Sequence, residues 1–273
     1  MARAPPDLES LDALLVELNR ASAAAILPLF RAEHGLEDKG RPGFFDPVTQ
    51  ADRGAEAAIR RIVAERHPDH GVIGEEYGED RPDADFVWVI DPIDGTRAFI
   101  AGLPVWTTLI GLRYRGEPVL GSIGQPYLSE LFIGHAGGAR LMSRGSSRQL
   151  ATRKGAPLNH AIIATTDPEA CFTPEELHAW RGLRAVARLA RLGCDAYAYA
   201  MVAAGALDLV VEAGLKAWDI EAAIPVLAGA GGVVTDWRGE AVGRRGGQVA
   251  LAGDRPLLEE ALSLLAPAAA LSL

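Results

Sequence analysis

Two segments near the start of the chain have the apolar spacing of amphipathic helices. In residues 8–33, leucines recur every three or four positions, and Pro28 is expected to end or kink this helix. A second helix is predicted over residues 51–66. The stretch 37–49 between them holds several glycines and prolines and is predicted to be a loop.

Short apolar runs separated by turn residues follow, which is the pattern of β-strands. Strands are predicted over residues 86–90, 107–114, 119–125, 130–134, 161–165, 207–212, 233–235 and 249–252. Helices are predicted over residues 174–181, 196–204, 220–230 and 255–265. Helices, then a run of strands, then alternating elements indicate a layered α+β or α/β fold, not a single doubly wound sheet.

The segment 136–159 is rich in Gly, Ser and Arg, and it is the predicted break in the chain. The sequence has no internal repeat and no long linker. We therefore expect the 273 residues to form a single domain, 1–273, with subdomains 1–145 and 146–273 on either side of this break.

The chain is acidic, since 27 Lys and Arg against 36 Asp and Glu give a formal charge of −9. Nucleic acid and anionic membranes are therefore poor candidate partners. Acidic residues interrupt the N-terminal stretch that a signal peptide would need, and no apolar run reaches the ~20 residues of a membrane helix. A cytoplasmic location is expected. Cys171 and Cys194 are expected to be free, buried thiols, with one disulfide as the alternative.

The segment most informative about chemistry is WVIDPIDGT, residues 88–96, in which an apolar strand leads into Asp91 and Asp94. A proline and a glycine favour a tight turn, which lets the two carboxylates converge. Hard divalent cations such as Mg²⁺ take oxygen ligands of this kind. Gly95 lets a ligand approach the backbone, and Thr96 is expected to cap a short helix whose N–H groups can receive an anion. A plain turn between strand and helix is the alternative.

Three other segments place acidic residues at element boundaries. Residues 73–76 end in a Glu–Glu pair, residues 217–219 put an aspartate behind a tryptophan, and residues 46–52 place two acids around a threonine. Each alone has an ordinary explanation as a helix cap or a solvated face. Only the joint occurrence of all four segments is specific.

In this order, the four segments resemble the inositol-monophosphatase superfamily of Mg²⁺-dependent, lithium-sensitive phosphatases. The resemblance covers about residues 10–260, and its most specific parts are residues 91–96 and the pair Trp218 and Asp219. It implies a layered αβαβα sandwich, a small phosphate monoester as substrate, two or three Mg²⁺ ions in each active site, and a homodimer.

The resemblance also implies roles for single residues. Glu75 resembles a ligand shared by the first metal and a weaker third metal, and Asp91 resembles the bridge between two metals. The backbone carbonyl of Ile93 would complete the first site. Asp94 and Asp219 resemble the remaining ligands of the second metal.

Further carried-over roles concern the water and the phosphate. Thr96 resembles the residue that orients the attacking water together with Glu75, and Asp52 resembles the partner behind it. The amides of Gly95 and Thr96 resemble the phosphate cradle. Lys39 is a candidate match for a lysine of the family's N-terminal loop.

The residue types suit phosphate hydrolysis independently of the resemblance. Water must attack phosphorus in line while an alkoxide leaves, and two metals about 3.5–4 Å apart can activate one oxygen and stabilise the other. No Ser, Cys or His stands in a recognised nucleophile setting, and the sequence has no Walker loop and no His-Glu-x-x-His motif.

Residues 96–112, 191–197 and 212–219 look most like the histidinol-phosphatase branch, which acts in histidine biosynthesis. L-Histidinol phosphate carries an ammonium and an imidazole opposite its phosphate, so its pocket needs an acceptor for a cation. Glu212 resembles the family's contact to the substrate alcohol. Asp195 stands where inositol-type members usually have a small neutral residue.

Other interpretations remain open at this point. Asp195 is equally well a helix N-cap, and Arg97, a candidate substrate contact, is equally well a surface arginine. The chain can instead be an inositol-1-phosphatase or a broad sugar-phosphate phosphatase, with the same catalytic core. A 3′-phosphoadenosine 5′-phosphate phosphatase would want basic residues for its second phosphate. A non-catalytic relative is disfavoured by the full carboxylate set, and the Asp-x-x-Asp-Gly spacing is not that of an EF-hand calcium sensor.

Overall fold

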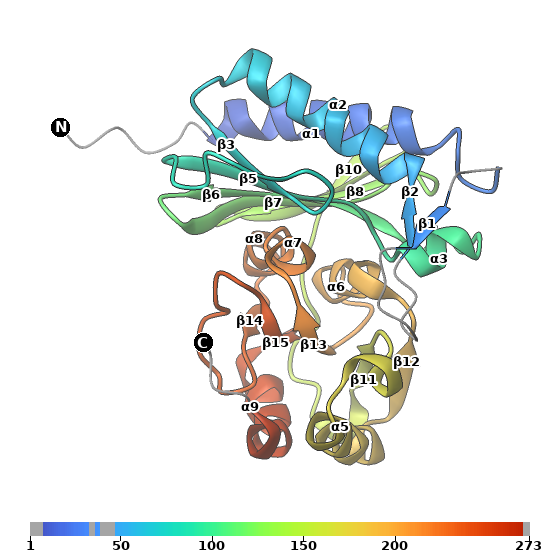
Figure 1. Cartoon of the computed structure of the whole chain (residues 1–273). Helices are drawn as coiled ribbons and strands as arrows, with labels where there is room; N and C mark the ends of the chain where they lie inside the picture. Colours follow the sequence, from blue (N-terminus) through green and yellow to red (C-terminus); the bar gives the residue numbers. More distant parts are fainter. Residues whose placement is uncertain (1–7, 33–35, 39–46, 270–273) are drawn as a thin grey trace.

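The computed structural model describes residues 8–32, 36–38 and 47–269. These residues form five layers in the order helices, sheet, helices, sheet, helices (Figure 1). The expected layered αβαβα sandwich is confirmed.

The outer helical layer consists of α1 (Leu8–Ile26) and α2 (Gln50–Arg66), which lie side by side on one face of the first sheet (Figure 1). The leucines of α1 recur on its buried face, as the spacing predicts. The helix ends at Ile26, seven residues before the end of the predicted segment 8–33 and two before Pro28, the residue expected to end or kink it.

The predicted loop 37–49 is in part a short antiparallel pair, β1 (Leu36–Asp38) with β2 (Pro47–Thr49). Residues 39–46 between these strands lie outside the described residues, and the pairing of the flanking segments was not predicted. Lys39 lies outside the described residues.

The first sheet has eight strands in the order β10-β9-β8-β7-β6-β5-β3-β4. Its strands are β3 (Gly71–Gly74), β4 (Gly78–Asp80), β5 (Phe86–Asp94), β6 (Thr107–Tyr114), β7 (Glu117–Gln125), β8 (Glu130–His135), β9 (Gly138–Ser143) and β10 (Ser146–Gln149). Only the β3–β5 pair is parallel among these described strands; the other neighbours are antiparallel. The short helix α3 (Thr96–Ile100) follows β5.

The predicted break 136–159 contains the hairpin β9–β10, which extends the first sheet to Gln149. Only Ala139 and Leu141, on either side of Arg140, alternate in burial along this hairpin, which is too short a pattern to predict it, and pairing with β8 determines its conformation. The boundary expected between residues 145 and 146 falls inside this hairpin. The division into subdomains stays a prediction.

The second sheet has five strands in the order β12-β11-β13-β15-β14. Its strands are β11 (Ile162–Thr165), β12 (Leu189–Leu192), β13 (Leu209–Leu215), β14 (Val233–Thr235) and β15 (Gly247–Ala252). The helices of this half are α4 (Pro168–Cys171), α5 (Pro174–Val186), α6 (Asp195–Ala203), α7 (Ala217–Ile220), α8 (Ala223–Gly229) and α9 (Arg255–Leu265), with 3₁₀ turns η1 (Leu158–His160) and η2 (Ala266–Ala268). The helix predicted over residues 220–230 corresponds to α8, which begins three residues later than predicted because Ile220 ends the separate helix α7.

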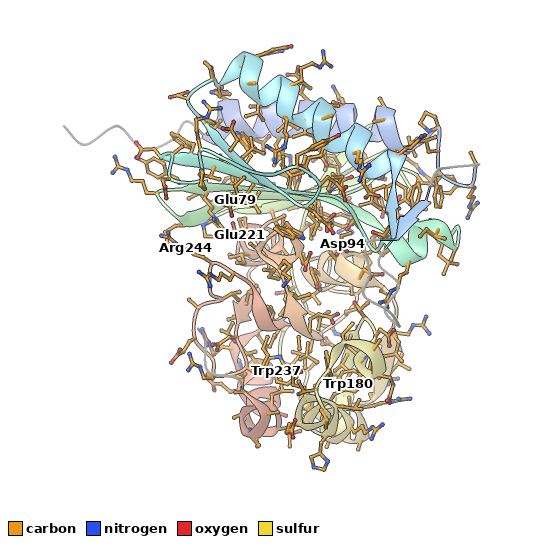
Figure 2. The ribbon with its side chains drawn as sticks, in the orientation of Figure 1. Glu79, Asp94, Trp180, Glu221, Trp237 and Arg244 are labelled. Carbon is orange, nitrogen blue, oxygen red and sulfur yellow. The ribbon has the colours of Figure 1, made fainter. Side chains whose placement is uncertain are left out.

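Helices α6, α7 and α8 fill the layer between the two sheets, and α5 and α9 cover the far face of the second sheet (Figure 1). Two glycines of the first sheet allow this close packing. A Cβ atom at Gly121 would overlap the backbone of Ala222, and one at Gly134 would overlap the backbone of Val226. Figure 2 shows Asp94 and Glu221 at the boundary between the first sheet and these helices.

Among the described residues, no helix combines the length and the apolar character that crossing a membrane requires.

Candidate active site

A turn at the end of β5 places two aspartates next to each other. The β5–β6 register shifts between Asp91 and Asp94, so the chain leaves the regular ladder here. The N–H of Ile93 donates to Oδ1 of Asp91 (3.0 Å), and the hydroxyl of Thr108 on β6 donates to the carbonyl of Pro92 (2.8 Å). The turn considered as an alternative explanation is thus present, and it is the same turn that positions the carboxylates.

A third carboxylate joins them from the second half of the chain. One oxygen from each of Asp91, Asp94 and Asp219 lies within 4.8 Å of the others. Two of these side chains are oriented by backbone amides: Asp219 Oδ2 accepts from the N–H of Lys216 (2.7 Å), and Asp94 Oδ2 accepts from the N–H of Ala196 at the start of α6 (2.6 Å). The second hydrogen bond joins the two halves of the molecule at the site.

The electrostatics of this cluster favour a bound cation. Burial raises the pKa of Asp91 well above its usual value, and nearby negative charges raise it further; in decreasing order they belong to Glu75, Asp94, Asp219 and Asp52. Burial likewise raises the pKa of Asp94, with smaller contributions from the charges of Asp195 and Asp219. An all-oxygen donor set of carboxylates that repel one another fits a hard divalent cation, which would restore their charged forms.

Two more predicted residues come from the side of α2 and β3. Glu75 follows β3, and its N–H donates to the carbonyl of Ile90 on β5 (3.3 Å), so it stands beside the strand that carries Asp91. Asp52, in the first turn of α2, is 3% exposed and close enough to influence the pKa of Asp91. The parallel β3–β5 pair thus brings Glu75 and Asp91 to the same end of the sheet.

The prediction that Thr96 caps α3 is wrong. Gly95, with φ of 83°, is the N-cap, and Thr96 is the first helical residue. The Thr96 hydroxyl donates to the carbonyl of Ile93 (3.1 Å) and makes no side-chain cap. Gly95 is suited to this position because a left-handed backbone costs it little.

Nearly all the predicted site residues line one cavity of about 310 Å³. Those lining it are Glu75, Asp91, Ile93, Asp94, Gly95, Thr96, Arg97, Asp195, Glu212 and Asp219. Asp52 is not among the lining residues and lies behind them. The cavity opens between the first sheet and the second half of the chain, which supplies Asp195, Glu212 and Asp219.

Glu212, on β13, is 3% exposed and is held by two hydroxyls. Thr166 Oγ1 donates to Oε1 (2.8 Å), and Thr165 Oγ1 donates to Oε2 (3.1 Å). Burial raises the pKa of Glu212 to about 8, although these hydrogen bonds lower it. With a pKa of about 8 this carboxyl is mostly protonated at neutral pH, and a cationic group reaching it would favour its charged form.

Asp195 is not the helix N-cap that was considered as an alternative. Cys194 is the N-cap of α6, and the amide of Ala196 is taken by Asp94. The Asp195 side chain instead lies over Gly95, where an added Cβ would stand 3.0 Å from its Cγ. Burial raises the pKa of Asp195 to about 6, whereas the charge of Arg97 lowers it.

Arg97 is a surface arginine at the mouth of the cavity. Its side chain is 45% exposed and lies 3.2 Å from Oδ2 of Asp167. Both interpretations of this residue are therefore compatible with its position. The ion pair joins α3 to the N-cap of α4.

Six lining residues were absent from the predicted site: Thr166, Cys171, Tyr199 and residues 213–215. The parallel pairing of β11 with β13 brings the end of β11, and so Thr166, next to Glu212. Only the motif TTD after a predicted strand signalled this contact. Both cysteines are free, as expected, but Cys171 is exposed and Cys194 half-buried, so the expectation of burial was wrong. Partial desolvation raises the pKa of the Cys171 thiol, which keeps it protonated at neutral pH.

The fold and the carboxylate-lined cavity define a class of metal-dependent hydrolases. The chain belongs to the Inositol monophosphatase family, which it matches over residues 7–270. This is a family of phosphatases that depend on metal ions in general, and the resemblance noted from the four segments is confirmed.

Individual relatives carry different activities in their names. The chain is 42% identical over 236 residues to the bifunctional phosphatase IMPL2, chloroplastic, of Arabidopsis thaliana, covering 86% of this chain and 66% of that protein. It is 37% identical over 193 residues to the histidinol-phosphatase of Chlorobaculum parvum, covering 71% and 73%. A solved structure of an inositol monophosphatase from Zymomonas mobilis superimposes with a TM-score of 0.84 at 38% identity, covering 96% of this chain and 100% of the other.

Proposed function

We propose that this phosphatase hydrolyses L-histidinol phosphate to L-histidinol and phosphate with the help of Mg²⁺. One observation carries the proposal: the cavity that holds the aspartate cluster also holds two further acidic side chains, Asp195 and Glu212. L-Histidinol phosphate has a phosphate at one end, which suits the aspartate cluster with its metal ions. Its ammonium and imidazole at the other end suit the two further acidic side chains. The named activity of the Chlorobaculum relative supports the same substrate.

The proposed metal ligands are Glu75, Asp91, Asp94 and Asp219 with the Ile93 carbonyl. When bound, Mg²⁺ supplies Lewis-acid activation of water and stabilises negative charge on the phosphate and the leaving oxygen. The orientations of Asp94 and Asp219 are fixed in advance by backbone amides, so little reorganisation is needed to hold the ions.

The residues beside the cluster orient the attacking water. The Thr96 hydroxyl donates its hydrogen bond to the Ile93 carbonyl, so its oxygen lone pairs are left to accept a hydrogen bond from water. Glu75 is the proposed carboxylate that draws the second proton, with Asp52 behind the site. The amides of Gly95 and Thr96 are the proposed phosphate contacts.

The other end of the substrate meets the second half of the chain. We propose that Asp195 accepts from the cationic group, and that Glu212, held by its two threonines, contacts the ammonium or the alcohol. Arg97 is proposed to close the rim through Asp167. A charge-assisted hydrogen bond contributes about 1.5–3 kcal/mol, so losing one should cost about tenfold or more in affinity.

The test is phosphate release with Mg²⁺ from L-histidinol phosphate, inositol 1-phosphate and 3′-phosphoadenosine 5′-phosphate at equal concentrations. We expect kcat/KM for L-histidinol phosphate to be about a hundredfold higher than for the others, or about 2.7 kcal/mol of differential binding. In Asp195→Asn, KM for L-histidinol phosphate should rise about tenfold and KM for inositol 1-phosphate should not. Glu169→Gln, which changes an exposed acid paired with Arg181, is the matched control.

A second candidate is an inositol-1-phosphatase or a broad sugar-phosphate phosphatase. The hydroxyl-bonded Glu212 suits a polyol, and the Zymomonas relative is named an inositol monophosphatase. Comparable rates on inositol 1-phosphate would favour it. A bisphosphate nucleotide suits the cavity less, because Arg97 is the one basic side chain among the described lining residues and it is paired with Asp167. No release from any substrate would favour a non-catalytic relative.

Three further expectations stay predictions. A homodimer is testable by light scattering, lithium inhibition by the same phosphate assay, and the cytoplasmic location by fractionation of the source cells.

A further inference from the structure

A buried glutamate that no proposed role has used lies on the helix that carries Asp52. Glu56 stands one helical turn after Asp52 on α2 and is fully buried, with 0% exposure. It does not line the cavity. A buried carboxylate is costly unless its oxygens are satisfied, so its partners indicate what it does.

Those partners are the backbone of the turn that presents Glu75. Glu56 Oε2 accepts from the N–H of Glu76 (2.8 Å), and Oε1 accepts from the N–H of Tyr77 (3.2 Å). Arg60 Nε also donates to Oε1 (2.7 Å), and another nitrogen of Arg60 donates to the carbonyl of Gly78. Glu56 and Arg60 thus hold the β3–β4 turn along its whole length.

The sequence of β3 accommodates this contact. A Cβ atom at Gly74 would overlap the carboxyl group of Glu56, so a side chain there would push the carboxylate away from the turn. The turn is held on its other side by the bond from the Glu75 amide to Ile90 on β5. The position of Glu75 relative to Asp91 is therefore fixed by two anchors, one of which is Glu56.

We propose that Glu56 is a positioning residue that sets the orientation of Glu75 as a metal ligand. This inference rests on the proposed function, since it assumes that Glu75 binds Mg²⁺. Groups that orient metal ligands typically change metal affinity by about 10–100-fold when they are removed. Because Glu56 acts through the backbone of the turn, it should change metal affinity without changing contacts to the substrate.

The test is calorimetric titration of Mg²⁺ into the metal-stripped protein, beside the phosphate assay. In Glu56→Gln, one oxygen is replaced by an amide that cannot accept from the turn. We expect about 10–100-fold weaker Mg²⁺ binding at the Glu75-dependent site and an unchanged substrate KM at saturating Mg²⁺. Glu65→Gln, an exposed glutamate on the same helix, is the matched control and should bind Mg²⁺ like the wild type.

A double-mutant cycle separates positioning from general destabilisation. If Glu56 acts through Glu75, adding Glu56→Gln to Glu75→Gln should weaken Mg²⁺ binding no further. Independent, multiplying effects would overturn the inference, as would wild-type affinity in Glu56→Gln. Should Glu56→Gln fail to fold, Glu56→Asp, which keeps the charge but is too short for the turn, replaces it in both comparisons. Absence of Mg²⁺ binding in the wild type, or wild-type affinity in Glu75→Gln, would overturn the proposed function as well.

Discussion

At the scale of single residues, the site depends on positions whose backbone restricts the side chain. Gly95 combines a φ of 83° with the close approach of Asp195, so a methyl group there is disfavoured twice. In Gly95→Ala, we expect a loss of about 1 kcal/mol of unfolding free energy from the left-handed backbone alone. We also expect at least a tenfold loss of kcat/KM, because the methyl group would displace Asp195. Denaturant unfolding and steady-state kinetics measure the two effects.

Gly145→Ala separates these effects. Gly145 has a φ of 81° and nothing within 4 Å of an added Cβ. It should therefore lose a similar free energy of unfolding and keep wild-type kcat/KM. Equal kinetic losses in both variants would show that the approach of Asp195 to Gly95 has no functional meaning.

The same residues mark what the sequence can and cannot predict about the site. The turn positions on WVIDPIDGT could be predicted because local turn chemistry determines them: a proline lies between the two aspartates and a glycine follows the second. The groups that satisfy the helix N-termini could not be predicted in this way. The free amide of Ala196 at the start of α6 donates to Asp94, 102 positions away in the chain, so tertiary packing decides this contact. Thr166 and Tyr199 were missed for the same reason, since they reach the cavity only through the second sheet and α6.

At the scale of elements, prediction succeeded where a local pattern matches burial. The strands Thr107–Tyr114 and Val233–Thr235 and the helix Arg255–Leu265 have the predicted bounds. β9, β10 and β12 were missed because their conformation depends on pairing with a neighbouring strand.

One buried ion pair fastens α7 to the first sheet. Arg113 on β6 donates through two nitrogens to Glu221, which directly follows α7 and lies two positions after Asp219. Both side chains are at most 9% exposed. In Glu221→Gln, an arginine is left buried without its charge partner, which should cost about 3–5 kcal/mol of unfolding free energy. Thermal unfolding should show a decrease in Tm of about 10 °C.

The exposed pair of Arg181 and Glu169 is the control for this prediction. Its side chains are 62% and 68% exposed, so Glu169→Gln should change stability by less than about 1 kcal/mol. Similar losses in the two variants would mean that burial adds nothing to the pair of Arg113 and Glu221.

At the scale of the whole molecule, the cavity between the two halves brings together carboxylates that repel one another, and a bound metal ion would relieve this repulsion. Without a cation, burial and neighbouring charges raise the pKa of Asp91 and Asp94, and burial raises that of Glu212 to about 8. Groups whose folded pKa is raised stabilise the fold below their unfolded pKa, and this contribution is lost as pH rises through the folded pKa. The metal-stripped protein should therefore become less stable between about pH 5 and pH 8.

Mg²⁺ should reverse this trend, because it binds the charged carboxylates and stabilises only the folded state. We expect the rise in Tm on adding Mg²⁺ to the stripped protein to be larger at pH 8 than at pH 5, measured by differential scanning calorimetry. In Asp91→Asn, the pH dependence without metal should flatten and the response to Mg²⁺ should shrink, since one charge has gone from the centre of the cluster. An equal Mg²⁺ response at both pH values, or an unchanged response in Asp91→Asn, would show that these carboxylates do not hold the ion. Asp94 and Asp219 come from different halves of the molecule, so either result would also mean that no metal ion held by these two residues connects the two halves.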